Sequence, residues 1–221
     1  MSTTTSKLLD GQSEAWQMIL EHPFIAATSD GSLPPVTFDQ WLTEDYFFVL
    51  SFRAFLDALR RVAPDNTARE VLAGGLAALV PELAMFEREA VARGLRLDAE
   101  PSLVNLGYSS YLLASVTEGW PVGITVLYGV EKAYYDAWAA VRDRTAPKSP
   151  YAEFIRNWSS PAFAAYVDRL AALVDREPLT RESERAFGRV VRFELAFWDQ
   201  VHSAPEAATS LNRVRARKVS A

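Results

Sequence analysis

The chain has 221 residues, is 49% hydrophobic and carries a net charge of −5. This length and apolar content suffice for one domain with a buried core, and the acidic balance argues against binding nucleic acid. The absence of cysteine excludes disulfides, thiolate catalysis and cysteine-ligated metals. No apolar run approaches the roughly 20 residues of a membrane helix, and the N-terminus lacks a secretory signal pattern. We therefore expect a soluble, cytoplasmic protein without a membrane partner.

Helical periodicity dominates the sequence and strand-like alternation is missing, so we predict an all-α fold. Gly, Pro and capping residues then set the expected boundaries between helices. The expected helices cover residues 6–21, 24–27, 37–61, 67–93, 102–115, 122–142, 151–157, 160–174 and 180–201.

Particular residues are expected to begin, interrupt or end these helices. His22-Pro23 should interrupt the first helix, and Thr37 should cap the long helix that follows the next turn. Pro81 predicts a kink or a break within 67–93.

The chain shows no repeat, low-complexity segment or linker, so residues 1–206 are expected to form a single helical domain. Residues 207–221 carry four basic side chains and no acid. We expect this tail to be a flexible, solvated terminus, with a basic partner-binding arm as the alternative.

Three carboxylates fall where the helical period should place apolar side chains. Asp45, Glu131 and Glu194 each have apolar or aromatic residues three, four or seven positions away, on the same helix face. Burying an ionised carboxylate alone is costly, so such groups are paired, protonated or used on a ligand. One such acid would be read as a structural hydrogen-bond partner. Three of them indicate a polar pocket inside a helical bundle.

Aromatic residues are concentrated around these acids. Aromatic faces can sandwich a flat heteroaromatic ring, while carboxylates exchange protons with its amino groups and ring nitrogens. Core packing is the alternative for most of them individually. The aromatic residues concerned are Tyr46, Phe47, Phe48, Tyr108, Tyr111, Tyr128, Tyr135, Phe193, Phe197 and Trp198.

Five segments, in order and suitably spaced, resemble the TenA/thiaminase II family. The resemblance spans almost the whole chain and implies a heme-oxygenase-like bundle of helices that encloses a central pocket. The five segments are His22-Pro23-Phe24, Asp30–Pro34, Thr43–Tyr46, Tyr108–Tyr111 and Phe193–Trp198.

The main departure from the family's cysteine class is at the nucleophile. That class has its cysteine four residues before a tyrosine and 23 residues after the central tyrosine, and these offsets select Glu131 here, between Tyr108 and Tyr135. The segment is similar to the family's second branch, which has glutamate in place of cysteine. Phe48 and Trp158 stand where tyrosines occur in other members, so the hydrogen bonds to the ligand should differ.

The resemblance implies roles for the matching residues. Asp45 would hold the amino group and adjacent nitrogen of an aminopyrimidine. Glu194 would be the acid/base partner, with Tyr108 and Tyr135 positioning it or the substrate. Glu131 would activate water as a general base, in preference to covalent attack. The wider substrate site would include Phe48, Trp158 and Phe197.

The function implied is a cofactor-free hydrolase of thiamin breakdown products, working as a homodimer or homotetramer. It would convert an aminomethyl-pyrimidine, or its N-formyl derivative, to hydroxymethyl-pyrimidine for thiamin salvage. The alternatives are a non-catalytic pyrimidine-binding or regulatory protein, and a metal-dependent oxygenase of the same fold. The chain's two histidines support the oxygenase poorly. His22 is expected to stabilise a helix terminus, and Glu82 to be a solvated or helix-end residue.

Overall fold

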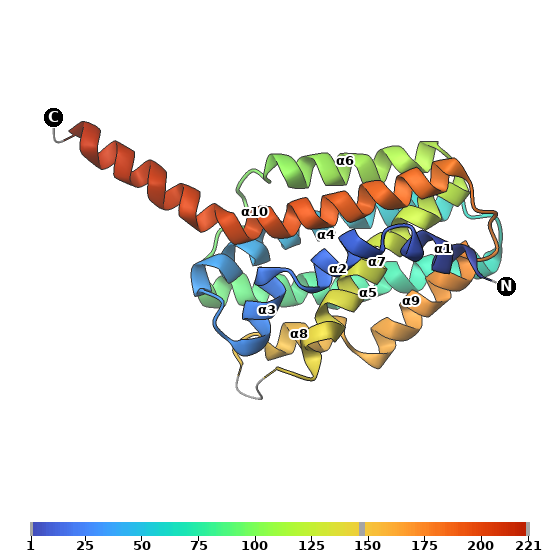
Figure 1. Ribbon diagram of the computed structural model, residues 1–221, viewed down its shortest axis with the longest axis horizontal. Helices are drawn as coiled ribbons and strands as arrows, with labels where there is room; N and C mark the ends of the chain where they lie inside the picture. Colours follow the sequence, from blue (N-terminus) through green and yellow to red (C-terminus); the bar gives the residue numbers. More distant parts are fainter. Residues whose placement is uncertain (1, 146–148, 220–221) are drawn as a thin grey trace.

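The computed structural model describes residues 2–145 and 149–219, with backbone alone for 204–219. Within these ranges the chain forms helices and no strand, which confirms the predicted all-α fold (Figure 1). The predicted loop at 146–150 lies mostly outside the described residues. The helices are α1 (Thr4–Asp10), α2 (Ser13–Leu20), α3 (Pro23–Asp30), α4 (Pro35–Arg61), α5 (Asn66–Arg93), α6 (Leu103–Thr117), α7 (Trp120–Arg142), α8 (Ala152–Trp158), α9 (Pro161–Val174) and α10 (Arg181–Val219).

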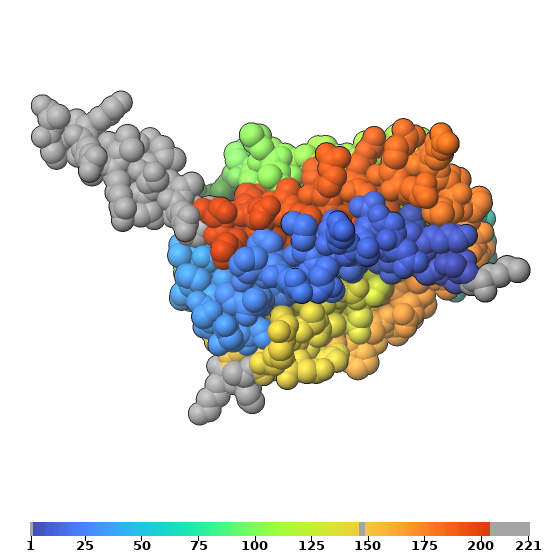
Figure 2. All heavy atoms as spheres, in the orientation of Figure 1, coloured from blue at the N-terminus to red at the C-terminus, as the bar shows by residue number. Residues whose placement is uncertain are grey.

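The single helix predicted over 6–21 is wrong, because the chain divides there into α1 and α2. Gly11 is a poor helix former, and Gln12 leaves the helical region with φ −125° and ψ 17°. The division lets α2 turn onto α10, where Trp16 stacks on Phe187 with ring centroids 5.5 Å apart. Figure 2 shows this N-terminal segment lying along α10.

Two of the expected proline and capping effects are also corrected. The helix α4 begins at Pro35, whose fixed φ suits a first helical position, so Thr37 lies inside the first turn and is not the cap. The helix α5 continues through Pro81, so of the predicted kink or break only the break is excluded. Gly94, with φ 68°, ends α5, and the Ser102 side chain caps α6, in agreement with the expected end of the helix over 67–93 and the expected start of the helix over 102–115.

The helix α7 lies at the centre of the bundle and packs against α6, α8, α9 and α10. The helix α4 packs against α5, α6 and α10. A cluster of tryptophans fills one end of the bundle interior: Trp41 and Trp158 lie with ring centroids 5.7 Å from Trp138. Packing of these large rings fixes the helices that carry the buried acids.

A buried acid next to Asp45 ties α4 to α6. The Glu44 carboxylate accepts hydrogen bonds from the Ser102 backbone N–H at 3.2 Å and from the Asn105 amide at 2.9 Å. The Asn105 amide also donates to the Glu44 carbonyl oxygen at 2.6 Å. These bonds set the start of α6, and Tyr108 follows Asn105 by one helical turn on the inward face.

The helix α10 is longer than predicted, because it continues past His202 to Val219 (Figure 1). Alanine and arginine, both good helix formers, are frequent in this stretch. Whether residues 207–221 form a flexible tail remains a prediction. Among residues 2–145 and 149–219, no helix is both long and apolar enough to cross a bilayer.

Removing residues 207–221 is expected to leave the unfolding temperature unchanged, because the segment has few large apolar side chains to bury. Thermal unfolding followed by circular dichroism measures this. A longer truncation that removes the buried Phe197 and Trp198 should destabilise the protein and serves as the control. A clear loss of stability in the shorter truncation would show that the tail docks on the domain or on another subunit.

Candidate active site

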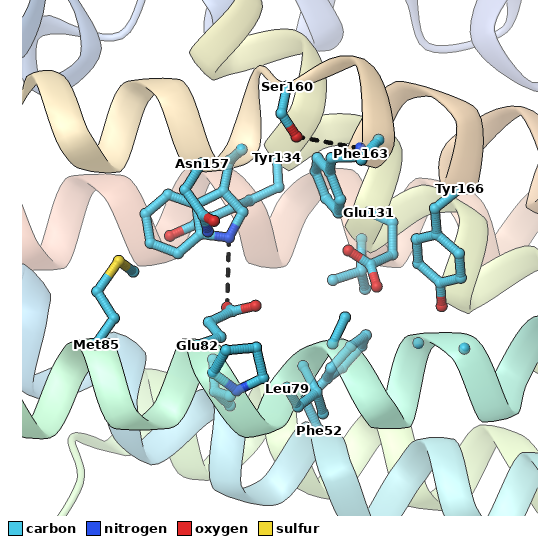
Figure 3. A pocket seen from close by; sticks show the side chains of 18 of the residues that line it. Phe52, Leu79, Glu82, Met85, Glu131, Tyr134, Asn157, Ser160, Phe163 and Tyr166 are labelled. Atoms are coloured by element: carbon cyan, nitrogen blue, oxygen red, sulfur yellow. Dashed lines mark hydrogen bonds between the residues drawn. The ribbon is translucent and has the colours of Figure 1, made fainter.

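A cavity of about 430 Å³ lies between α4, α5, α7, α8 and α9. Its volume is within the range of small-molecule sites, roughly 300–1,000 Å³. The walls of the cavity are mostly apolar, and carboxyl and phenol groups project from them into the cavity (Figure 3). The polar groups that matter most are Asp45, Glu82, Glu131, Tyr134 and Tyr166.

Asp45 lies on the α4 wall of this cavity and is only 2% exposed. Tyr134 donates its hydroxyl proton to Asp45 Oδ2 at 2.7 Å, and the Trp41 indole N–H in turn donates to the Tyr134 oxygen at 3.2 Å. Burial raises the pKa of Asp45 to about 7, and the hydrogen bond from Tyr134 opposes part of that rise. Asp45 therefore titrates near neutrality in a fixed orientation.

Glu131 projects from α7 into the same cavity (Figure 3). Burial raises its pKa well above the usual range, and repulsion first from Glu82 and then from Glu194 adds to the rise. Within the described residues, no hydrogen bond reaches the Glu131 carboxyl. Glu131 is therefore the acid whose oxygens are open to a water molecule or a ligand.

Glu194 occupies a smaller space next to the cavity. This space, of about 10 Å³, shares Asp45, Phe48 and Tyr134 with the cavity and also borders Tyr108 and Phe197. A void of that size admits at most one water molecule, so a pyrimidine must lie in the larger cavity.

The Glu194 carboxyl is held by Tyr108. The Tyr108 hydroxyl donates to Glu194 Oε1 at 2.6 Å, as the predicted positioning role of Tyr108 requires. The Tyr108 ring is itself stacked on Phe193 with centroids 4.8 Å apart. Burial raises the pKa of Glu194 to about 8, against the hydrogen bond from Tyr108 and together with repulsion from Asp45.

The expectation for Tyr135 is wrong, because this residue borders neither space. Its ring lies 6.1 Å from the Phe163 ring, and the Lys132 ammonium lies 5.8 Å from its centroid. Tyr134 is the tyrosine that contacts Asp45. Positions three and four after Glu131 both lie near the Glu131 face of the helix, and packing against α4 and α10 decides which one points inward.

Glu82 is a second correction, since it lines the cavity, is half-buried and lies within α5 rather than at a helix end. Its carboxyl accepts a hydrogen bond from the Trp158 indole N–H at 3.3 Å (Figure 3). Burial, followed by repulsion from Asp45, raises its pKa to about 8. The signal for Glu82 was present in the sequence: Leu79 and Met85 flank it at helical spacing, and the expected break at Pro81 hid the pattern.

The aromatic residues predicted for the substrate site divide between the two spaces. Phe48 borders both, Trp158 borders only the cavity, and Phe197 borders only the small space. Trp158 was expected to leave the site without a hydroxyl donor. Its indole N–H supplies a donor of another kind, aimed at Glu82.

His22 lies away from the cavity and stabilises a helix start. Its Nδ1 accepts the Phe24 backbone N–H at 3.2 Å, and its Nε2 lies 3.2 Å from Asp199. The terminus-stabilising interpretation of His22 is therefore confirmed. In the part of the chain that the structure describes, no three histidine, cysteine, aspartate or glutamate side chains are grouped so that they could hold a metal ion.

The sequence pattern of the TENA/THI-4/PQQC family matches residues 11–204. This chain belongs to that family. A TenA homologue from Pyrococcus furiosus has a solved structure that superposes with a TM-score of 0.84 at 33% identity, covering 90% of this chain and 99% of the homologue. The all-α bundle is thus the heme-oxygenase-like fold that the resemblance implied.

Two curated relatives extend the comparison. A probable bifunctional TENA-E protein from Glycine max is 27% identical over 192 residues, which are 80% of this chain and 84% of the relative. An aminopyrimidine aminohydrolase from Halalkalibacterium halodurans is 25% identical over 203 residues, which are 85% of this chain and 90% of the relative.

The raised pKa values predict a pH-dependent effect of Glu194→Gln on stability. A folded-state pKa of about 8 against 4.5 means that the folded form binds the proton more tightly than the unfolded chain. The stabilisation from this group is complete below pH 4.5 and is lost as the pH rises to about 8. The Gln variant, which Tyr108 can still donate to, should therefore gain stability relative to wild type between pH 5 and pH 8, by on the order of a few kcal/mol at most.

Chemical denaturation at each pH measures this difference. Glu70→Gln removes an exposed acid from α5 outside the cavity and should show no such trend. Stability curves of Glu194→Gln and wild type that run parallel across this pH range would contradict a protonated Glu194.

Proposed function

We propose that this protein is a cofactor-free hydrolase of thiamin breakdown products. Its substrate is an aminomethyl-pyrimidine or the N-formyl derivative, and its product is hydroxymethyl-pyrimidine for thiamin salvage. The observation that carries the proposal is that two acids from different helices, Asp45 and Glu131, project into one cavity and have raised pKa values. The likeness to a protein named aminopyrimidine aminohydrolase supports the reaction class.

We assign the chain to the branch of the family that has glutamate in place of the catalytic cysteine. The sequence contains no cysteine. Glu131, which has the cysteine's sequence offsets from Tyr108 and Tyr135, lines the cavity. Intact thiamin should be a poorer substrate, because no thiol is present to displace its thiazolium. A cytoplasmic homo-oligomer remains our expectation for the working enzyme.

Asp45 recognises the pyrimidine edge. An aminopyrimidine presents an amino N–H beside a ring nitrogen, and a carboxyl group held by Tyr134 can accept from the first and share a proton with the second. Phe48 and Trp158 border the same cavity and provide flat apolar faces for the ring. Glu194, bonded to Tyr108, serves as the acid/base partner on the Asp45 side of the ring.

Glu131 activates the attacking water. Burial raises the pKa of Glu131, and this makes its carboxylate a stronger base for removing a proton from water as the oxygen attacks the substrate carbon. With the amine, the methylene C–O bond forms, the C–N bond breaks and ammonia leaves. With the N-formyl derivative, water first attacks the formyl carbon and releases formate and the amine.

Glu131→Gln should lower turnover by a factor on the order of 10² to 10⁴, the usual contribution of a positioned acid or base. The substitution keeps the volume of the side chain and removes only the base. Binding of the pyrimidine should change far less, because Asp45 and the aromatic walls remain. Steady-state kinetics with the aminomethyl-pyrimidine, combined with calorimetric binding, measures both quantities.

Asp45→Asn should have the opposite profile and weaken binding first, because it removes the charged acceptor for the ring. If both variants lose binding equally while turnover per bound substrate stays intact, Glu131 has only a structural role. Tight binding by the wild type without any product would favour the alternative, a pyrimidine-binding or regulatory protein.

A further inference from the structure

Glu82 is the cavity acid to which the proposed reaction assigns no task. It projects from α5, opposite Glu131 on α7, and both carboxyl groups point into the same space (Figure 3). A purely structural position in this apolar wall would be filled more favourably by an apolar side chain, because an acid there must be desolvated. The presence of this acid at the cavity surface therefore indicates that it binds a group of the ligand.

The orientation of Glu82 is fixed by one neutral donor. The Trp158 indole N–H, 3.3 Å from Glu82 Oε1, is held in place because its ring packs on Trp138 and Phe154 with interplanar angles of 26°. The carboxyl group is thus aimed into the cavity without a cation to neutralise it. Within the described residues, the basic group nearest this space is Arg169, which is exposed and lies over the Tyr166 ring at 6.0 Å.

The groups around Glu82 favour a protonated carboxyl. Every titratable group that borders the cavity besides Arg169 is an acid or a phenol, so ionisation of Glu82 would add a second negative charge near Asp45. Repulsion between Glu82 and Glu131 is also larger than that between Glu131 and Glu194. The groups that face Glu82 are Asp45 on α4, Glu131 and Tyr134 on α7, Trp158 on α8, and Tyr166 and Arg169 on α9.

We propose that Glu82 is the proton donor to the leaving nitrogen, so that the wall formed by Glu82 and Trp158 is the subsite for the amine or acylamine group of the substrate. This inference rests on the proposed function. With the ring held at Asp45, the exocyclic carbon and nitrogen extend between Glu131 and Glu82. Glu194 is less suited to this task, because it lies in the adjoining small space and is bonded to Tyr108.

The proton transfers balance over one turnover. Glu131 takes a proton from water as the C–O bond forms, and Glu82 gives its proton to the nitrogen as the C–N bond breaks, so that ammonia leaves. The carboxylate left on Glu82 and the carboxylic acid on Glu131 then exchange a proton through water, which restores the starting state. The same two steps release the amine from an N-formyl substrate.

A change of leaving group tests the role of Glu82 directly. Glu82→Gln should lower turnover of the aminomethyl-pyrimidine by a factor on the order of 10² or more. It should leave nearly intact the hydrolysis of an analogue with a 4-nitrophenoxymethyl group, whose leaving group needs no proton at neutral pH. Glu131→Gln should lower turnover of both compounds. Glu70→Gln removes the charge of an exposed residue on the same helix and controls for nonspecific effects.

The pH profile with the amine provides a second readout that a structural role would not change. The alkaline limb of kcat/KM should become shallower in Glu82→Gln, because Glu194, whose pKa is also raised to about 8, is then the remaining acid in that range. In Trp158→Phe the alkaline limb should move to higher pH, because the indole N–H stabilises the charged carboxylate.

Equal losses on both leaving groups in Glu82→Gln, or an unchanged alkaline limb, would show that Glu82 is not the donor, even if Glu131 is the base. Absence of amine turnover by the wild type would instead overturn the proposed function itself. The two failures are therefore distinguishable.

Discussion

The gathering of four carboxyl groups around two adjoining interior spaces is the constraint on which the rest of this structure depends. Asp45, Glu82, Glu131 and Glu194 come from four different helices, and no buried cation lies among them in the described part of the chain. Several ionised carboxylates could not coexist there, because each one raises the cost of ionising the next. The site must hold protons at neutral pH, and its chemistry follows from that.

The chain offsets part of this cost with one neutral donor for each of three acids. Tyr134 donates to Asp45, Trp158 to Glu82 and Tyr108 to Glu194. Each donor is an aromatic side chain fixed by ring packing, so the donors orient the acids as well as stabilise them. Glu131 has no such donor among the described residues, which leaves it as the group available to a water molecule. Active sites of enzymes commonly contain groups that lower the stability of the folded protein.

Much of this arrangement follows from periodicity in the sequence. The helical period placed Asp45, Glu131 and Glu194 on inward faces, and all three are buried at 9% exposure or less. Local capping rules placed the Ser102 start of α6 and the Gly94 end of α5. These features depend on residues within a turn or two of each other, so the sequence alone contains the information.

The features that the sequence did not predict depend on tertiary packing. Whether Tyr134 or Tyr135 faces Asp45 is decided by how α7 packs against α4 and α10. Glu82 was missed because Pro81 beside it predicts a kink or a break, whereas α5 continues through this residue. The split at Gly11 was missed because the docking of α2 on α10 is likewise a long-range effect.

The most direct test of this account is a ¹³C NMR titration of the aspartate and glutamate side-chain carboxyls, assigned with Asp45→Asn, Glu82→Gln, Glu131→Gln and Glu194→Gln. The account predicts that these four carboxyls keep their protons well above pH 5, with apparent midpoints shared within the coupled cluster, while surface carboxyls titrate near pH 4. If all four titrate near pH 4 with the surface groups, the interior acids are ionised at neutral pH and the proposed proton transfers are wrong.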